Sequence, residues 1–143
     1  MGRASEEELN RNPTPDISDP QVRREYSRSA IAGFAAIMNA WAVRSDDATE
    51  LIGGIPPESY EAINSGKYVE TLSEDQLTRI SYLIGIYKAL HILLPKDIAD
   101  TWMGRPNDNH MFGGIAPLAF CLKEGLPGLA QVRRLLDGEI QPH

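Results

Sequence analysis

The chain has 143 residues, a formal net charge of −6 and a single cysteine, Cys121. One cysteine excludes an intramolecular disulfide framework and fits a reducing compartment, and no apolar run approaches the ~20 residues that a transmembrane helix needs. The acidic balance argues against a polyanion as the default partner of the bare chain. Glu6-Glu7-Glu8 stands where a signal peptide would be apolar, so we expect a soluble, cytoplasmic protein.

Residues 1–19 are polar and acid-rich and include two prolines. Such a stretch buries too little apolar surface to offset the entropy lost on ordering, so we expect it to be disordered or ordered only by a partner. Asp19-Pro20 then has the pattern of a helix cap followed by proline in the first turn. Apolar residues recur from there at steps of three and four, which predicts one amphipathic helix ending near Arg44.

The second half of this helix carries an apolar seam, which consists of Phe34, Ile37, Met38 and Trp41. As an exposed seam it would mediate dimerisation, and as a buried face it would be part of the core. The spacing fits both interpretations.

Two short helices are predicted next. Asp46 or Asp47 caps the first, which Gly53-Gly54 ends, and the second begins at two prolines and ends before Gly66. A short helix, a glycine-containing turn and another short helix outline a helix-turn-helix, while two ordinary helices of a bundle fit the spacing equally well.

The strongest local signal is the capping box at Ser73-Glu74-Asp75-Gln76. A wide apolar stripe follows it up to Pro95, and its members are Leu77, Ile80, Leu83, Ile84, Tyr87, Leu90, His91 and Leu94. We predict that this helix is the spine against which both ends of the protein pack. Asp97 is predicted to cap the helix after it.

The charge of the helix-turn-helix region argues against DNA binding. Residues 46–80 contain eight acidic residues and two basic ones, a net charge of −6. Phosphate contacts dominate affinity for duplex DNA, so stand-alone binding is expected to be weak or absent. The candidate DNA contacts are Arg23, Arg24, Arg28 and Lys67.

The last third of the chain is divided by glycine and proline. Pro106-Asn107 predicts a loop, Pro117 begins a short helix, and Gly125 ends it. A final helix opens near Gly128, buries apolar residues at helical spacing and ends before Gly138. The expected fold is all-α.

No set of residues predicts catalysis. His91 is expected to be a half-buried core residue, His110 lies in an Asn/Asp turn, and His143 is the last residue. Cys121 has no neighbouring base, and Gly113-Gly114 lacks the other residues of a phosphate loop. We therefore expect that the protein is not an enzyme and that it binds neither a cofactor nor a metal.

An ordered set of residues in the last third resembles the toxin-binding domain of Xre/MbcA/ParS-type antitoxins over about residues 98–140. The set is Trp102, Pro106-Asn107, Gly113-Gly114, Pro117-Leu118, Gly128, Val132 and Leu136. The resemblance implies a type II antitoxin with a degenerate Xre-like helix-turn-helix domain at 20–95 and a toxin-binding module with a C-terminal tail at 96–143. The implied partner is a RES-domain toxin, which consumes NAD or transfers ADP-ribose from it and whose NAD pocket the antitoxin blocks.

The resemblance also implies a homodimer or a larger complex with the toxin, and operator binding by that complex. The positions it assigns to toxin binding, with their neighbours, are Trp102, Arg105, Pro106, Asn107, Gly113, Gly114, Pro117, Leu118, Arg133, Arg134, Glu139, Ile140 and His143. The alternative is a stand-alone helix-turn-helix regulator, which the acidic helix before Gly66 disfavours.

Overall fold

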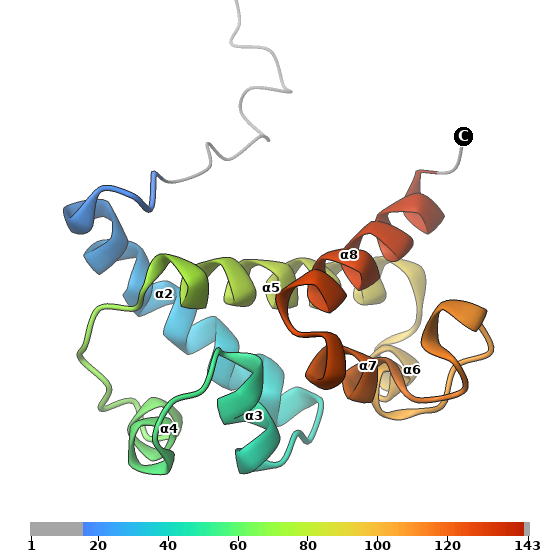
Figure 1. Cartoon of the computed structure of the whole chain (residues 1–143), viewed down its shortest axis with the longest axis horizontal. Helices are drawn as coiled ribbons and strands as arrows, with labels where there is room; N and C mark the ends of the chain where they lie inside the picture. Colours follow the sequence, from blue (N-terminus) through green and yellow to red (C-terminus); the bar gives the residue numbers. More distant parts are fainter. Residues whose placement is uncertain (1–15, 142–143) are drawn as a thin grey trace, which may run out of the picture.

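The computed structural model describes residues 16–141, and within them every regular element is a helix (Figure 1). The elements are α2 (Pro20–Ala40), α3 (Ser45–Leu51), α4 (Pro57–Asn64), α5 (Glu74–Leu93), α6 (Lys96–Ala99), the 3-10 helices η1 (Trp102–Gly104) and η2 (His110–Phe112), α7 (Pro117–Glu124) and α8 (Leu126–Ile140). The all-α prediction is confirmed. The expectation of disorder concerned residues 1–19, of which residues 1–15 lie outside the described residues. None of the described helices has the length and apolar character needed to cross a membrane.

Helix α5 is the spine of the fold, as its apolar stripe predicted. It runs through the middle of the molecule and contacts α2 on one side and α8 on the other (Figure 1). Its N-terminus has the predicted capping box, in which the Gln76 N–H donates to Ser73 Oγ at 3.1 Å and the Ser73 N–H donates to Gln76 Oε1 at 2.8 Å. Because neighbours cover it on two sides, Ile86 and Ala89 are buried as well, beyond the predicted stripe.

Helix α2 begins as predicted but ends earlier. The Asp19 carboxylate accepts the Gln21 N–H at 2.9 Å, with Pro20 in the first turn. The helix stops at Ala40 rather than near Arg44, because Ala42 has a φ of 55°, which a right-handed helix does not admit. This stop has no glycine, which is why the sequence pattern missed it.

The apolar seam of α2 is core. Phe34, Ile37, Met38 and Trp41 are all less than a tenth exposed. Their interpretation as a dimerisation surface is wrong, and the alternative, a buried face, is confirmed.

Helices α3 and α4 form the predicted pair and pack against each other. Neither Asp46 nor Asp47 caps α3, because the cap position is Arg44 and both carboxylates lie in the first turn, where the helix dipole favours negative charge. Gly66, at a φ of 79°, follows the end of α4 as expected. Their identity as a helix-turn-helix stays an interpretation.

The strained Ala42 gives a prediction with a stabilising sign. Ala42→Gly is expected to raise the free energy of unfolding by about 0.5–1 kcal/mol, because glycine adopts positive φ without the clash between Cβ and carbonyl. Urea unfolding followed by circular dichroism measures it. The matched control is Ala36→Gly, an exposed position inside α2, where the same change should cost about 1 kcal/mol. If both variants were destabilised equally, Ala42 would carry no strain.

Candidate functional site

The loop between α6 and α7 is held closed by its own asparagines. The Asn107 side-chain oxygen accepts the Asn109 N–H at 2.9 Å, and the Asn109 side chain accepts the Met111 N–H at 2.9 Å. The Asn107 N–H donates to the Ile115 carbonyl at 3.3 Å, which joins the two ends of the loop. These are Asx turns, as the Asn/Asp composition predicted, and among residues 16–141 no group of three metal-ligating side chains comes together.

Three aromatic rings fix the loop to the helices behind it. The Phe112 ring lies edge-on to Trp102 at 6.1 Å and to Phe120 at 5.2 Å between centroids. Phe112 is 2% exposed, so η2 is anchored through it to α7. The backbone that these contacts hold in place presents the outer face of the loop to solvent.

Helices α7 and α8 approach closely at a glycine. A Cβ on Gly128 would lie 2.7 Å from the Cβ of Glu124, closer than ordinary contact permits. Gly125, at a φ of 72°, makes the turn between the two helices. Beyond this turn, Leu129, Val132 and Leu136 are buried on one face of α8, as their spacing predicted.

The predicted end of the last helix is wrong. Gly138 was expected to stop it, but α8 continues to Ile140, and the Gln141 N–H donates to the Asp137 carbonyl at 3.0 Å. Gly138 does not take up the positive φ of a helix stop. Glu139 and Ile140 are therefore helical residues rather than a free tail, and His143 lies outside the described residues.

The predicted toxin-binding residues differ in accessibility. Exposed ones are Arg105, Pro106, Gly113 and Gly114 on the loop and Arg134 and Glu139 on α8; half-buried ones are Trp102, Asn107, Leu118, Arg133 and Ile140. Pro117 is buried in the first turn of α7 and holds the shape of the module. Helix α7 contacts both η1 and α8 and so joins the two sets.

His91 joins α5 to α6 in a way that no sequence pattern indicated. Its Nδ1 lies 2.9 Å from the Tyr87 carbonyl oxygen, and its Nε2 lies 3.0 Å from Asp100 Oδ1. Asp100 also accepts a hydrogen bond from Lys96 Nζ at 3.0 Å, and this bond raises the pKa of Lys96. The half-buried core histidine is confirmed. Its partner Asp100 is nine residues away across a turn, which periodicity does not reveal.

Cys121 is buried under α8, and desolvation raises the pKa of its thiol to about 12. Because the thiolate is the nucleophile, the thiol stays protonated and unreactive at pH 8 in the folded protein. We expect alkylation by iodoacetamide to be at least about a hundredfold slower than in urea, where the thiol regains a pKa near 8.5. Equal rates in the two conditions would contradict the burial of Cys121.

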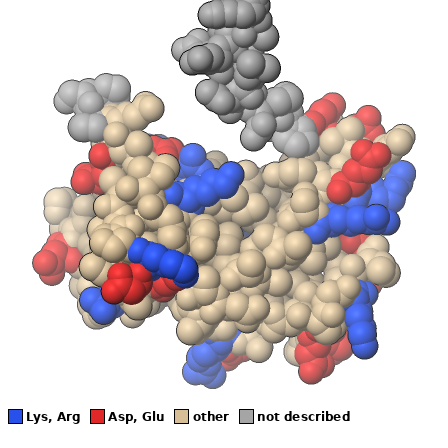
Figure 2. All heavy atoms as spheres, turned by 180° about the vertical axis from the view of Figure 1, so that it is seen from behind, with Lys and Arg blue, Asp and Glu red and all other residues tan. Residues whose placement is uncertain are grey.

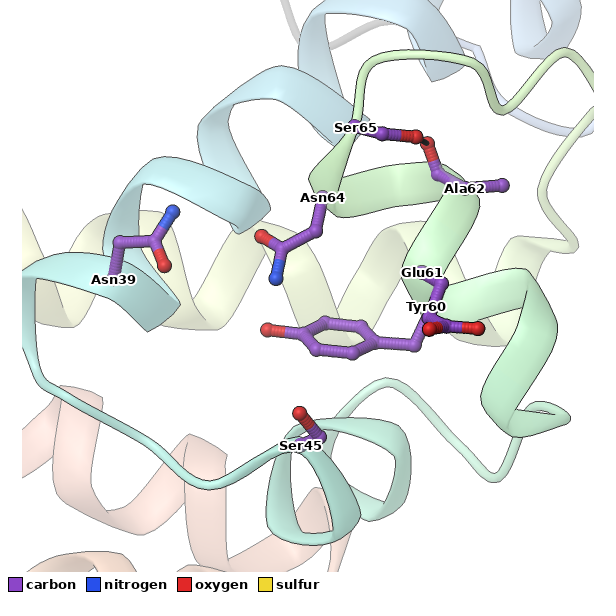
Figure 3. Close-up of a pocket in the computed structure, with 7 residues that line it drawn as sticks. All are labelled: Asn39, Ser45, Tyr60, Glu61, Ala62, Asn64 and Ser65. Atoms are coloured by element: carbon purple, nitrogen blue, oxygen red, sulfur yellow. Dashed lines mark hydrogen bonds between the residues drawn. The ribbon is translucent and has the colours of Figure 1, made fainter.

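A pocket beside α4 is lined mainly by uncharged polar side chains. Figure 3 shows the Tyr60 hydroxyl pointing towards the space between Asn39 and Asn64, in a shallow pocket of about 810 Å³. The Tyr60 ring is buried against Phe34, and burial raises the pKa of its hydroxyl. Within the described part of the chain, Glu61 is the only charged residue that lines this pocket. A surface of this kind can donate and accept hydrogen bonds but does not attract phosphate.

Two of the candidate DNA contacts, Arg24 and Arg28, line one pocket with Ile63 of α4, together with the acidic Glu70. Arg23 is tied down, because its Nη1 donates to the Ile17 carbonyl at 2.8 Å and lies 3.9 Å from Glu74. Arg24 and Arg28 are exposed on α2, and Lys67 is exposed after α4. On the face shown in Figure 2, charged groups of both signs lie towards the edge around an uncharged middle, so no basic strip crosses it.

The uncharacterized protein y4oB of Sinorhizobium fredii is similar to this chain. It is 32% identical over 123 residues, which cover 85% of this chain and 92% of that protein. Residues 89–139 match the antitoxin Xre/MbcA/ParS C-terminal toxin-binding domain. The chain belongs to the Xre/MbcA/ParS antitoxin family. No solved structure matches this antitoxin.

The matched range confirms the resemblance that the ordered residues of the last third predicted. In the antitoxin it begins at Ala89 inside α5, includes η1, η2 and α7, and ends in the last turn of α8. The last turns of the spine helix are thus part of the toxin-binding domain. The partner of this antitoxin is a toxin.

Proposed function

We propose that this antitoxin binds and neutralises a RES-domain toxin, an enzyme that consumes NAD or transfers ADP-ribose from it, by blocking the NAD pocket. The match of residues 89–139 to a toxin-binding domain carries the proposal. The RES class and the NAD pocket come from the resemblance of the ordered motif residues to this family.

Two sets of exposed residues supply the proposed contact surface. The loop set contains Arg105, Pro106 and the two glycines after η2, and the α8 set contains Arg134 and Glu139. Arginine binds carboxylates and phosphates through paired hydrogen bonds, so both sets offer groups for an anionic toxin surface. A homodimer or a larger assembly with the toxin belongs to the same proposal, as does operator binding only by that assembly.

The gene neighbourhood is the first test. The adjacent reading frame is expected to encode a RES-domain protein that co-purifies with this chain. If the neighbouring frame encoded a toxin of another class, the antitoxin role would stand, but the proposed blocking of an NAD pocket would be contradicted. If no toxin is encoded beside the gene, the result would favour the alternative function, a stand-alone helix-turn-helix regulator.

Truncation after Gly138 tests how the pocket is blocked. It removes the last two residues of α8, Glu139 and Ile140, and everything beyond them. We expect toxin affinity to stay within about tenfold, because the loop and most of α8 remain, while inhibition of NAD turnover at saturating antitoxin is largely lost.

A chain cut after Gln141 is the matched control, since it keeps α8 whole. Loss of inhibition in both chains would assign the block to Pro142 and His143. Equal inhibition by the full chain and the chain cut after Gly138 would contradict plugging and leave steric coverage by the module.

A further inference from the structure

A groove of about 490 Å³ is lined by residues of α2, α5 and α8. Both α2 and α8 contact α5, which runs through the middle of the molecule (Figure 1). Tyr26 of α2 forms one wall, Arg133 and Ile140 of α8 form the other, and Ile84, Lys88 and Ile92 lie along α5. The three α5 residues are four apart, so they share one face of the helix. The groove is therefore a continuous surface built by three helices.

Arg133 is held over the spine helix with its outer nitrogens free. Its Nε donates to both carboxylate oxygens of Asp137, at 2.9 and 3.0 Å. Neither Nη atom has a hydrogen-bond partner within residues 16–141. The guanidinium therefore has donors left for an external acceptor, and Asp137 fixes its position.

Gly85 makes this position of Arg133 possible. A Cβ on Gly85 would overlap Nη1 and Cζ of Arg133, so the guanidinium lies directly against the backbone of α5. Glycine weakens the interior of a helix relative to alanine, and Gly85 lies in the middle of α5. Gly85, which weakens the helix, thus lies at the position where the Arg133 side chain passes over α5.

The rest of the groove combines apolar surface with positive charge. Ile92 is 69% exposed, and Ile84 and Ile140 are half-buried. Among residues 16–141, the charged residues that line the groove are Lys88, Arg133 and Asp137, which gives an excess of one positive charge. Its chemistry suits a carboxylate that lies beside an aliphatic side chain.

We propose that this groove binds a segment of the toxin in which an acidic side chain pairs with Arg133 and Lys88 and an aliphatic neighbour rests on Ile84 and Ile92. The inference rests on the proposed function and adds to it a contact site on the spine helix. The toxin is the occupant because Ile92, Arg133 and Asp137 all lie within the matched toxin-binding range. The positive excess complements an acidic partner.

The test measures the dissociation constant of the full-length antitoxin with the purified toxin from the adjacent reading frame. Arg133→Met removes the donors and should weaken binding by about tenfold or more. Gly85→Ala keeps every charge and displaces only the guanidinium, a flexible end, so it should weaken binding without lowering the thermal midpoint. Arg44→Met is the matched control, because Arg44 pairs with Asp46 outside the matched range.

The outcomes separate the two proposals. If wild type does not bind the toxin, the proposed function falls and the groove proposal with it. If wild type binds and all three variants bind equally well, only the groove proposal is overturned. Amide hydrogen exchange tests whether the chain's own acidic segment, Glu6-Glu7-Glu8, occupies the groove instead. If removal of residues 1–15 speeds exchange at residues 84–92 in the free antitoxin, that segment fills the groove. This result would also overturn the groove proposal.

Discussion

The Leu136→Asp variant is expected to lose about 3–5 kcal/mol of unfolding free energy, enough to leave much of a marginally stable domain unfolded. Leu136 is 4% exposed on the face of α8 that packs against α5. An aspartate there would bury a carboxylate among apolar side chains and also remove the packing of leucine. Urea unfolding followed by circular dichroism measures the loss, and toxin capture should disappear with the folded state.

Gly138→Asp is the matched control because it adds the same side chain to the same helix. Gly138 is exposed, and a Cβ there meets no atom within 4 Å. Its unfolding free energy is expected to stay within about 1 kcal/mol of wild type. Similar losses in both variants would show that the added charge on α8, rather than burial, is responsible.

Phe112→Ala is expected to cost about 3–4 kcal/mol, the usual loss for a buried phenylalanine. Its ring packs edge-on against both Trp102 and Phe120, so alanine would remove both contacts and leave a cavity. The near-ultraviolet circular dichroism of Trp102 should weaken together with the stability, since the indole loses its edge-on neighbour.

His110→Ala serves as the control in the same 3-10 turn. The side chain of His110 is exposed, so the change should alter stability by less than about 0.5 kcal/mol. A Phe112→Ala variant as stable as His110→Ala would mean that η2 does not depend on the aromatic contacts.

Several helix starts could be predicted from the sequence because their signals are local, but the caps predicted at Asp46 or Asp47 and at Asp97 are wrong. The cap positions of α3 and α6 are Arg44 and Pro95, and the three carboxylates lie in the first turns. Asp19-Pro20, the Ser73 capping box and Pro117 each place a helix start within a few neighbouring residues, and all three are confirmed. Helix ends were less predictable. Ala42 ends α2 without a glycine, and Gly138 lies inside α8 although glycine usually marks an end.

In the candidate site, too, local features could be predicted from the sequence and features formed by distant residues could not. The Asx turns at Asn107 and Asn109 depend on residues two apart and could be predicted. The groove could not, because it needs Gly85 and Arg133, which are distant in sequence, at the crossing of α5 and α8. The spacing of apolar residues along either helix does not show where the two helices cross, so no sequence pattern indicated a role for Gly85.

The shared position of α5 has a consequence for how the antitoxin is lost. Helix α5 contacts both α2 and α8, and within residues 16–141 the buried apolar residues form one core that includes all three helices. We expect a single cooperative unfolding transition. A protease that cut α2 away would strip one side of α5 and loosen the helix that holds the toxin-binding domain in place. Partial degradation is therefore expected to lower the stability of the toxin-binding domain before that domain is itself cut.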